Sequence, residues 1–149
     1  VPRFLQDGRW QPHATQTTLS NAMDVSNPNN WPRIQHLLDQ GLIDAAELSA
    51  VAVSEADTVQ AVRDLDALGY LSEPHAALAY KALQDSLQAG EFGVFLGTAH
   101  PAKFTDSVDC ILGRDIDVPD VLLAASRRPT LNGRITADYA ALKAQLLLL

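Results

Sequence analysis

The chain has 149 residues, of which 47% are hydrophobic, 19% are charged and only 6% are aromatic. This apolar content excludes an intrinsically disordered chain and is sufficient for one domain whose core is mainly Leu, Ala and Val. The net charge of −7 argues against a nucleic-acid partner, because proteins that bind nucleic acids need a basic surface. The single cysteine, Cys110, excludes an intrachain disulfide and a cysteine-based zinc site, and it fits a reducing compartment such as the cytoplasm.

The two ends of the chain are unusual for a complete soluble protein. The first residue is Val1 rather than Met, and the sequence ends on four leucines, Leu146 to Leu149. Exposed to water, these leucines would form an unfavourable apolar patch. No apolar run approaches the roughly 20 residues that span a membrane, so we expect no membrane partner. We therefore expect this chain to be a piece of a larger protein.

The first half of the chain divides into an irregular region and a helical region. Residues 1–30 lack the periodicity of a helix or a strand. The polar stretch 15–24, in which Asp24 is the only charged residue, suits a ligand-site loop as well as an ordinary surface loop. Residues 31–69 predict a helical hairpin. Its first helix follows Asn30 and ends at Gly41, and its second follows Ser54 and ends at Gly69. The second helix has an apolar stripe at helical spacing, formed by Val59, Val62, Leu65 and Leu68.

The second half predicts a helix, a strand and further helices. Ser72 is the expected cap of an alanine-rich helix that runs from Pro74 to about Leu87 and packs on a sheet. The apolar run Phe92–Gly97 predicts a buried parallel strand, and residues 101–112 predict the helix after it. Residues 119–125 and 136–148 predict two more helices, with Thr136 as the cap of the last.

This order of elements predicts an α/β fold that is mostly helical, with few parallel strands in this segment. One strand cannot form a sheet. We therefore expect the rest of the sheet to lie in residues outside this chain.

Few side chains show the spacing that chemistry requires. No two of the four histidines are three or four residues apart, so we expect no metal site. The segment Glu73–His75 opens the alanine-rich helix, where the helix dipole favours a carboxylate, so a structural role is favoured for it over a catalytic one. Lys103 lies near the start of the next helix, where a cation opposes the dipole. Either a bound phosphate or carboxylate explains this lysine, or it is simply solvated.

Three segments resemble the carboxyl-terminal part of threonine synthase, in its bacterial and fungal branch. They are Thr18–Arg33 (TLSNAMDVSNPNNWPR), Gly69–Tyr80 (GYLSEPHAALAY) and Gly97–Phe104 (GTAHPAKF). The likeness extends from Arg3 to at least Gly113 with the same order and spacing, and the residues beyond are less distinctive. The resemblance implies the carboxyl-terminal part of a two-domain α/β enzyme of the tryptophan-synthase-β type, with pyridoxal 5′-phosphate between the domains.

The resemblance also implies an activity and a division of labour. The family converts O-phosphohomoserine and water to threonine and phosphate, in threonine biosynthesis. The lysine that binds the cofactor, and the loop that holds the cofactor phosphate, lie upstream of the matched region. None of Lys81, Lys103 and Lys143 stands in the context of that lysine. We therefore expect no catalytic residue in this chain, no activity of the chain alone, and the remainder of the same enzyme as its partner.

The resemblance assigns candidate site residues and regions. Thr98 is expected to hydrogen-bond the pyridine nitrogen of the cofactor, and Asn21, Asp24 and Lys103 are expected to form the substrate side of the cleft. Residues 1–30 are then an active-site loop region, 31–69 a helical hairpin, 70–113 the unit that carries Thr98, and 114–149 carboxyl-terminal helices. Two other interpretations remain open: a binding or regulatory module that has lost catalysis, and an oligomerisation domain without a site.

Overall fold

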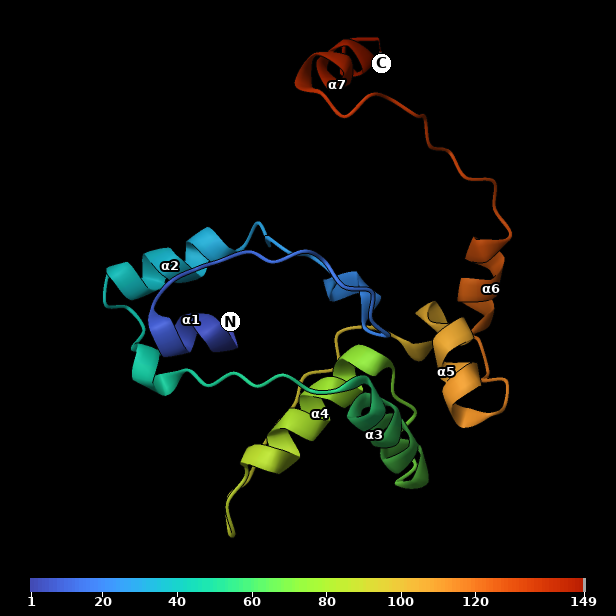
Figure 1. The fold of residues 1–149 in the computed structure, drawn as a ribbon. Coiled ribbons are helices and arrows are strands. Elements are labelled where there is room, and N and C mark those ends of the chain that lie inside the picture. Colours follow the sequence, from blue (N-terminus) through green and yellow to red (C-terminus); the bar gives the residue numbers. More distant parts are fainter. Residues whose placement is uncertain (149) are drawn as a thin grey trace. The chain divides into compact units, whose positions relative to one another are not determined.

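The structure, a computed structural model, describes residues 1–148, and within them all regular secondary structure is helical (Figure 1). The chain divides into two compact units, Val1–Asp117 and Val118–Leu149. No helix among the described residues is long and apolar enough to cross a membrane.

The first unit begins with a short helix in the stretch that the sequence predicts to be irregular. Helix α1 (Pro2–Asp7) has proline in its first turn and ends at Gly8, whose φ of 70° is the left-handed conformation that glycine adopts easily. Six residues are too few to show helical periodicity, so the sequence pattern missed it. Helix α2 (Trp31–Asp39) follows Asn30, as predicted, and has proline at its second residue; the Asn30 side chain makes no capping hydrogen bond.

An aromatic cluster joins α1 to the start of α2. Trp31 is buried, Trp10 stacks on it with ring centroids 4.0 Å apart, and Phe4 meets its edge at 4.6 Å. Such pairs contribute about 0.5–1.5 kcal/mol beyond the area that they bury. Together with the 3₁₀ turns η1 (Asn21–Met23) and η2 (Ala45–Glu47), these helices form the amino-terminal part of the unit.

The core of the first unit lies between α3 (Glu55–Ala67), α4 (Pro74–Ser86) and α5 (Thr105–Leu112). Its buried cluster is small-residue rich and consists of Ala61, Val62, Leu65, Ala77 and Ile111. The alanines allow α3 and α4 to approach closely, so the alanine-rich helix packs on helix α3 rather than on the predicted sheet. Leu68, predicted to belong to the apolar stripe of α3, is exposed, because the helix ends at Ala67 and Leu68 lies in the turn before Gly69.

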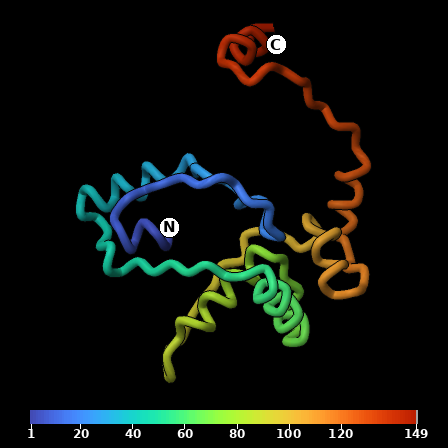
Figure 2. The backbone as a smooth tube through the Cα atoms, in the orientation of Figure 1, coloured from blue at the N-terminus to red at the C-terminus, as the bar shows by residue number. Residues whose placement is uncertain are grey.

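Both helices of the predicted hairpin, residues 31–69, are present as α2 and α3, but α2 is not the main packing partner of α3. The main partners of α3 are α4 and α5, and a long irregular stretch, residues 48–54, leads from η2 to α3 (Figure 2). Ser54 caps α3 as predicted: its Oγ accepts a hydrogen bond from the backbone N–H of Asp57 at 3.1 Å. Gly69 ends the helix with φ 82°.

The prediction of a strand at Phe92–Gly97 is wrong for this chain. The segment is irregular, because no other segment among residues 1–148 pairs with it. Its side chains nevertheless alternate: Phe92, Val94 and Leu96 are 92%, 70% and 76% exposed, whereas Gly93 and Phe95 face the helices. A 3₁₀ turn, η3 (Pro101–Lys103), then precedes α5, which ends at Gly113.

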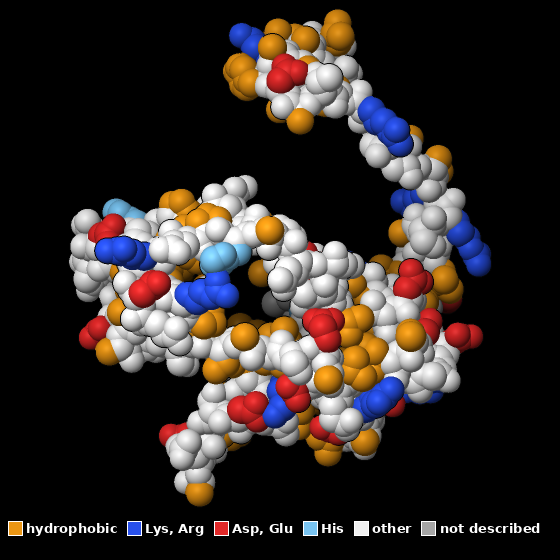
Figure 3. Space-filling model, viewed as in Figure 1, with side chains coloured by type: hydrophobic (Ala, Val, Ile, Leu, Met, Phe, Trp, Pro, Cys, Tyr) orange, Lys and Arg blue, Asp and Glu red, His pale blue; other side chains and the backbone are white. Residues whose placement is uncertain are grey.

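The second unit contains α6 (Asp120–Ser126) and α7 (Tyr139–Leu146). Asp138, not the predicted Thr136, caps α7: its carboxylate accepts a hydrogen bond from the backbone N–H of Ala141 at 2.8 Å. Thr136 instead donates its hydroxyl to Asp138 at 2.5 Å. Hydrophobic side chains are exposed over the α7 end (Figure 3), including Tyr139, Leu142 and Leu146 to Leu148. Leu149, the last of the four terminal leucines, lies outside the described residues.

Candidate functional site

The start of α4 carries a buried carboxylate. Glu73 is only 1% exposed, and it caps α4 in place of the predicted Ser72. Its two carboxylate oxygens accept hydrogen bonds from the backbone N–H groups of His75 and Ala76, both at 2.8 Å. Ser72 is also buried, but its hydroxyl donates to the backbone carbonyl of Glu73 at 3.1 Å and reaches no N–H of the helix. The longer Glu73 side chain therefore takes over the cap.

His75 extends this carboxylate into a pair of side chains. Its ring Nδ1 lies 2.5 Å from Glu73 Oε2, and its Nε2 is buried without a hydrogen-bond partner in the described part of the chain. The imidazole also packs on the ring of Phe104, with centroids 4.8 Å apart. Glu73 and His75 thus link the start of α4 to the segment that follows η3.

The segment Gly97–Lys103 begins against the same end of α4. A Cβ atom placed on Gly97 would lie 3.0 Å from Tyr70 Oη and 3.7 Å from Ala76 Cβ. The next residue, Thr98, is exposed. Its hydroxyl has no hydrogen-bond partner among residues 1–148, so it remains available to a ligand.

The loop 18–24 is held in shape by its own side chains. Asp24 accepts hydrogen bonds from the backbone N–H of Thr18 at 2.9 Å and from the Thr18 hydroxyl at 2.6 Å. The backbone N–H of Leu19 donates to Glu55 at 2.9 Å, which fixes the loop to the first turn of α3. Asn21 is exposed in the turn η1.

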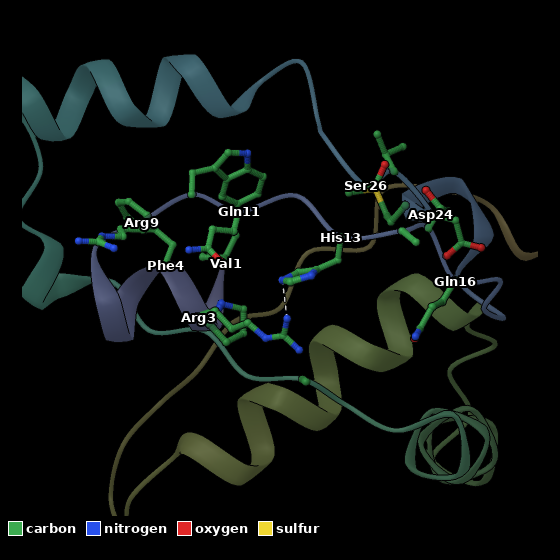
Figure 4. A pocket seen from close by; sticks show the side chains of 16 residues that line it. Val1, Arg3, Phe4, Arg9, Gln11, His13, Gln16, Asp24 and Ser26 are labelled. Carbon is green, nitrogen blue, oxygen red and sulfur yellow. Dashed lines mark hydrogen bonds between the residues drawn. The ribbon is translucent and has the colours of Figure 1, made fainter.

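Two cavities adjoin this loop. The larger, of about 780 Å³, lies between the loop, α4 and the segment before Thr98, where Ser20, Met23, His75 and Leu96 line it. The smaller, of about 480 Å³, lies beside α1 and includes Asp24 (Figure 4). In it Arg3 points toward His13 and hydrogen-bonds the ring, while the Arg9 guanidinium points away from both.

The four predicted site residues do not share one cavity. Asp24 lines the smaller cavity with a carboxylate that already holds Thr18, and Asn21 lines neither cavity. Thr98 and Lys103 are both exposed, and neither lines the larger cavity, although Leu96, two residues before Thr98, does. The larger cavity does bring the predicted substrate loop, through Ser20 and Met23, to the strand-like segment that leads to Thr98.

The sequence pattern did not predict the contact between the Glu73 and His75 side chains. Glu73 is followed by proline at the first helical position, a pattern typical of a helix start, so a structural role was favoured. The signal that could have revealed the pair is the imidazole two residues later, within reach of the same carboxylate. No group of three or more His, Cys, Asp or Glu side chains gathers for a metal ion within residues 1–148.

The residues around the larger cavity suit a small polar ligand better than a metal ion. The cavity volume is within the range typical of small-molecule sites, about 300–1,000 Å³. The cavity wall contains His75, whose Nε2 has no hydrogen-bond partner in the described part of the chain. The exposed Thr98 follows two residues after Leu96, which also lines the cavity. A hydroxyl and an imidazole can each hydrogen-bond a polar group of a small ligand.

Comparison with known proteins identifies the relatives of this chain. Residues 76–145 match the family model "Threonine synthase, C-terminal". The chain is 55% identical over 143 residues to threonine synthase from Escherichia coli K12 and 46% identical over 147 residues to that from Haemophilus influenzae. These matches cover 96% and 99% of the chain, but the chain spans only 33% and 35% of these relatives.

Solved structures agree with the sequence matches. The crystal structure of Escherichia coli threonine synthase superposes with a TM-score of 0.88 and 53% identity, over 99% of this chain and 35% of that one. A pyridoxal-phosphate-bound threonine synthase from Brucella melitensis superposes with a TM-score of 0.65 and 25% identity, over 86% of this chain and 33% of that one. The chain is therefore similar in sequence and fold to about a third of each relative.

Proposed function

We propose that this chain, which is homologous to the carboxyl-terminal third of threonine synthase, forms one wall of the active site of a pyridoxal-phosphate-dependent threonine synthase. The complete enzyme would convert O-phosphohomoserine and water to threonine and phosphate in the cytoplasm. The observation that carries the proposal is the exposed Thr98 hydroxyl, which has no hydrogen-bond partner among the described residues and directly follows Gly97, a residue that lies against the start of α4.

Thr98 would hold the cofactor by its ring nitrogen. When bound, pyridoxal phosphate supplies a ring that withdraws electrons from the amino-acid substrate. A threonine hydroxyl can donate a hydrogen bond to an unprotonated ring nitrogen, whereas an aspartate would keep that nitrogen protonated. With Thr98 at its nitrogen, the cofactor ring would withdraw electrons less strongly than a protonated ring. Proton transfers would be made by residues outside this chain.

The substrate side would be formed by the loop 18–24 and by Lys103. The hydrogen bonds of Asp24 to Thr18 give this loop a fixed shape, and the link from Leu19 to Glu55 anchors it to α3. The Asp24 carboxylate would act through that shape, because its oxygens are already engaged. Lys103, on the turn η3, would attract the substrate phosphate or carboxylate.

The remainder of the same enzyme would cover the apolar side of the segment 92–96. Phe92, Val94 and Leu96 are large, exposed and spaced by two residues, as on one face of a strand. This chain spans about a third of the length of its relatives. The remaining two thirds of the enzyme would supply the sheet that pairs with this segment. Unpaired strand edges recruit other chains, so the chain alone should aggregate.

The test is made in the protein encoded by the complete reading frame that contains Val1. We expect that protein to bind pyridoxal phosphate, visible by its absorbance, and to release phosphate from O-phosphohomoserine. Thr98→Val removes the donor but keeps the shape, and should weaken cofactor binding by about 1 kcal/mol, or about fivefold, with a lower kcat. Thr130→Val, at another exposed threonine, is the matched control and should change neither quantity.

Two outcomes would contradict the proposal. A reading frame that begins at the edge of this chain would support the regulatory or binding module instead. A Thr98→Val enzyme with the cofactor affinity and the turnover of its parent would show that Thr98 only shapes the turn before η3.

A further inference from the structure

Glu73 makes more contacts than a helix cap requires. Hydrogen bonds to the backbone N–H groups of His75 and Ala76 already satisfy the start of α4. The same carboxylate also holds Nδ1 of His75 at 2.5 Å, although its side chain is 1% exposed. A shorter, exposed Ser or Asp would suffice for capping, so the buried carboxylate serves the imidazole as well.

His75 is fixed from two sides. Because Nδ1 faces a carboxylate, we assign the proton to Nδ1, which leaves Nε2 as a buried acceptor without a partner in the described residues. An unpartnered buried polar atom destabilises a fold, whereas an apolar side chain in its place would not. The other contact of the ring is with Phe104, at a centroid distance of 4.8 Å. The presence of histidine here therefore calls for a role beyond packing.

Both ends of the segment 97–104 rest on the start of α4. At one end Gly97 lies against Tyr70 and Ala76, where a Cβ atom would approach to 3.0 and 3.7 Å. At the other end Phe104 packs on His75. Thr98 and Lys103 stand between these two contacts and are both exposed. A shift of the imidazole would move Phe104, and with it the residues that the proposed function assigns to cofactor and substrate.

We propose that Glu73 and His75 form a positioning pair in which Glu73 orients the imidazole and the imidazole, through Phe104, fixes Thr98 and Lys103 relative to α4. Neither side chain transfers a proton in this role. The proposal rests on the proposed function, because its effect is transmitted through the contact of Thr98 with the cofactor. It predicts that the pair and Thr98 are energetically coupled.

The test is a double-mutant cycle in the complete enzyme. His75→Leu, Thr98→Val and the double variant are compared for the dissociation constant and the absorbance maximum of bound pyridoxal phosphate, and for the melting temperature of the cofactor-free protein. We expect His75→Leu to weaken cofactor binding and shift the absorbance maximum. We also expect the effects of the two changes to differ from additivity by at least about twofold.

Controls and a second variant keep the proposal open to refutation. His36→Leu, at an exposed histidine of α2, should leave cofactor binding and absorbance unchanged. If His75→Leu fails to fold, His75→Asn retains a donor toward Glu73 and should recover part of the cofactor affinity, because Nδ2 of Asn replaces Nδ1. Additive effects, or a lower melting temperature with parental cofactor affinity and absorbance, would reduce the pair to packing and overturn this proposal alone. A parent enzyme that binds no pyridoxal phosphate would overturn the proposed function, and this proposal with it.

Discussion

The contact between Gly97 and Tyr70 should control the position of Thr98. In Gly97→Ala the new methyl group would lie 3.0 Å from Tyr70 Oη and 3.7 Å from Ala76 Cβ. The second distance is an ordinary van der Waals contact, so Ala76 need not move. The first is too short, so either the Tyr70 ring or the backbone next to Thr98 must shift. Overpacking of this kind costs about 1–3 kcal/mol, and the half-exposed Tyr70 ring can move, so we expect about 1 kcal/mol.

A second substitution should relieve the clash. Tyr70→Phe removes the hydroxyl oxygen that the methyl group would approach, and that oxygen has no hydrogen-bond partner in the described part of the chain. The contact of the ring edge with Phe95, at a centroid distance of 6.0 Å, is retained. Tyr70→Phe alone should therefore be nearly neutral, and the double variant Tyr70→Phe/Gly97→Ala should recover most of the lost stability.

The assay is a set of four proteins, each the complete enzyme, compared by urea midpoint and by affinity for pyridoxal phosphate. We expect Gly97→Ala to lose both stability and cofactor affinity, and the double variant to recover both. Gly133→Ala serves as the control, because nothing lies within 4 Å of a Cβ atom placed there. Equal losses in Gly97→Ala with and without Tyr70→Phe would refute the reasoning, because the Tyr70 oxygen would then not be the obstacle.

Three further predictions concern other parts of the chain. The isolated 149-residue chain should have no threonine synthase activity, and borohydride reduction with peptide mapping should find no stoichiometric cofactor adduct; an adduct on Lys103 with turnover would contradict this. In the complete enzyme Lys103→Ala should raise KM for O-phosphohomoserine roughly 10- to 150-fold, since a charge-assisted contact contributes about 1.5–3 kcal/mol, and an unchanged KM would remove Lys103 from the site. The Thr136 hydroxyl and the backbone N–H of Ala141 hold the pKa of Asp138 below its ordinary 3.8, so the cap of α7 is fully effective above that value and is lost as the pH falls through the lowered pKa. NMR titration of the Asp138 carboxyl tests this, and a midpoint at or above the ordinary value would contradict it.

Helix ends set by local chemistry were predictable from the sequence. Ser54 caps α3, and Gly69 ends it in the left-handed conformation, because these choices depend on only a few neighbouring residues. The prediction that Ser72 caps α4 was wrong because it, too, considered only neighbouring residues. Both residue types can accept from a helix N–H, and only the burial of the Glu73 side chain with His75 decides between them.

The candidate site was predictable only in part, because its contacts are distant in sequence. The motif around Thr98 points to the exposed hydroxyl, but nothing near it in sequence shows that Gly97 rests on Tyr70 and Ala76. Nor does the sequence show that both oxygens of the Asp24 carboxylate accept hydrogen bonds from Thr18. These bonds make Asp24 a residue that shapes the loop. Periodicity and capping describe single elements, whereas a cleft is formed by side chains from several.

The strand prediction for Phe92–Gly97 failed for a reason that lies in the two faces of this segment. Gly93 lies so close to Leu83 that a Cβ atom there would approach it to 2.7 Å, and Phe95 packs on Tyr70 and Tyr80. One face of the segment 92–97 is thus fully used by α4 and its neighbours, while the other face exposes its large side chains. An alternation with a period of two indicates that side chains point to two opposite faces. A strand also requires a neighbouring strand to which its backbone can hydrogen-bond. The pattern therefore describes a segment that α4 covers on one side. In the proposed complete enzyme this segment would pair with a sheet, and Thr98 would lie at its carboxyl end, where ligands of α/β sheets bind.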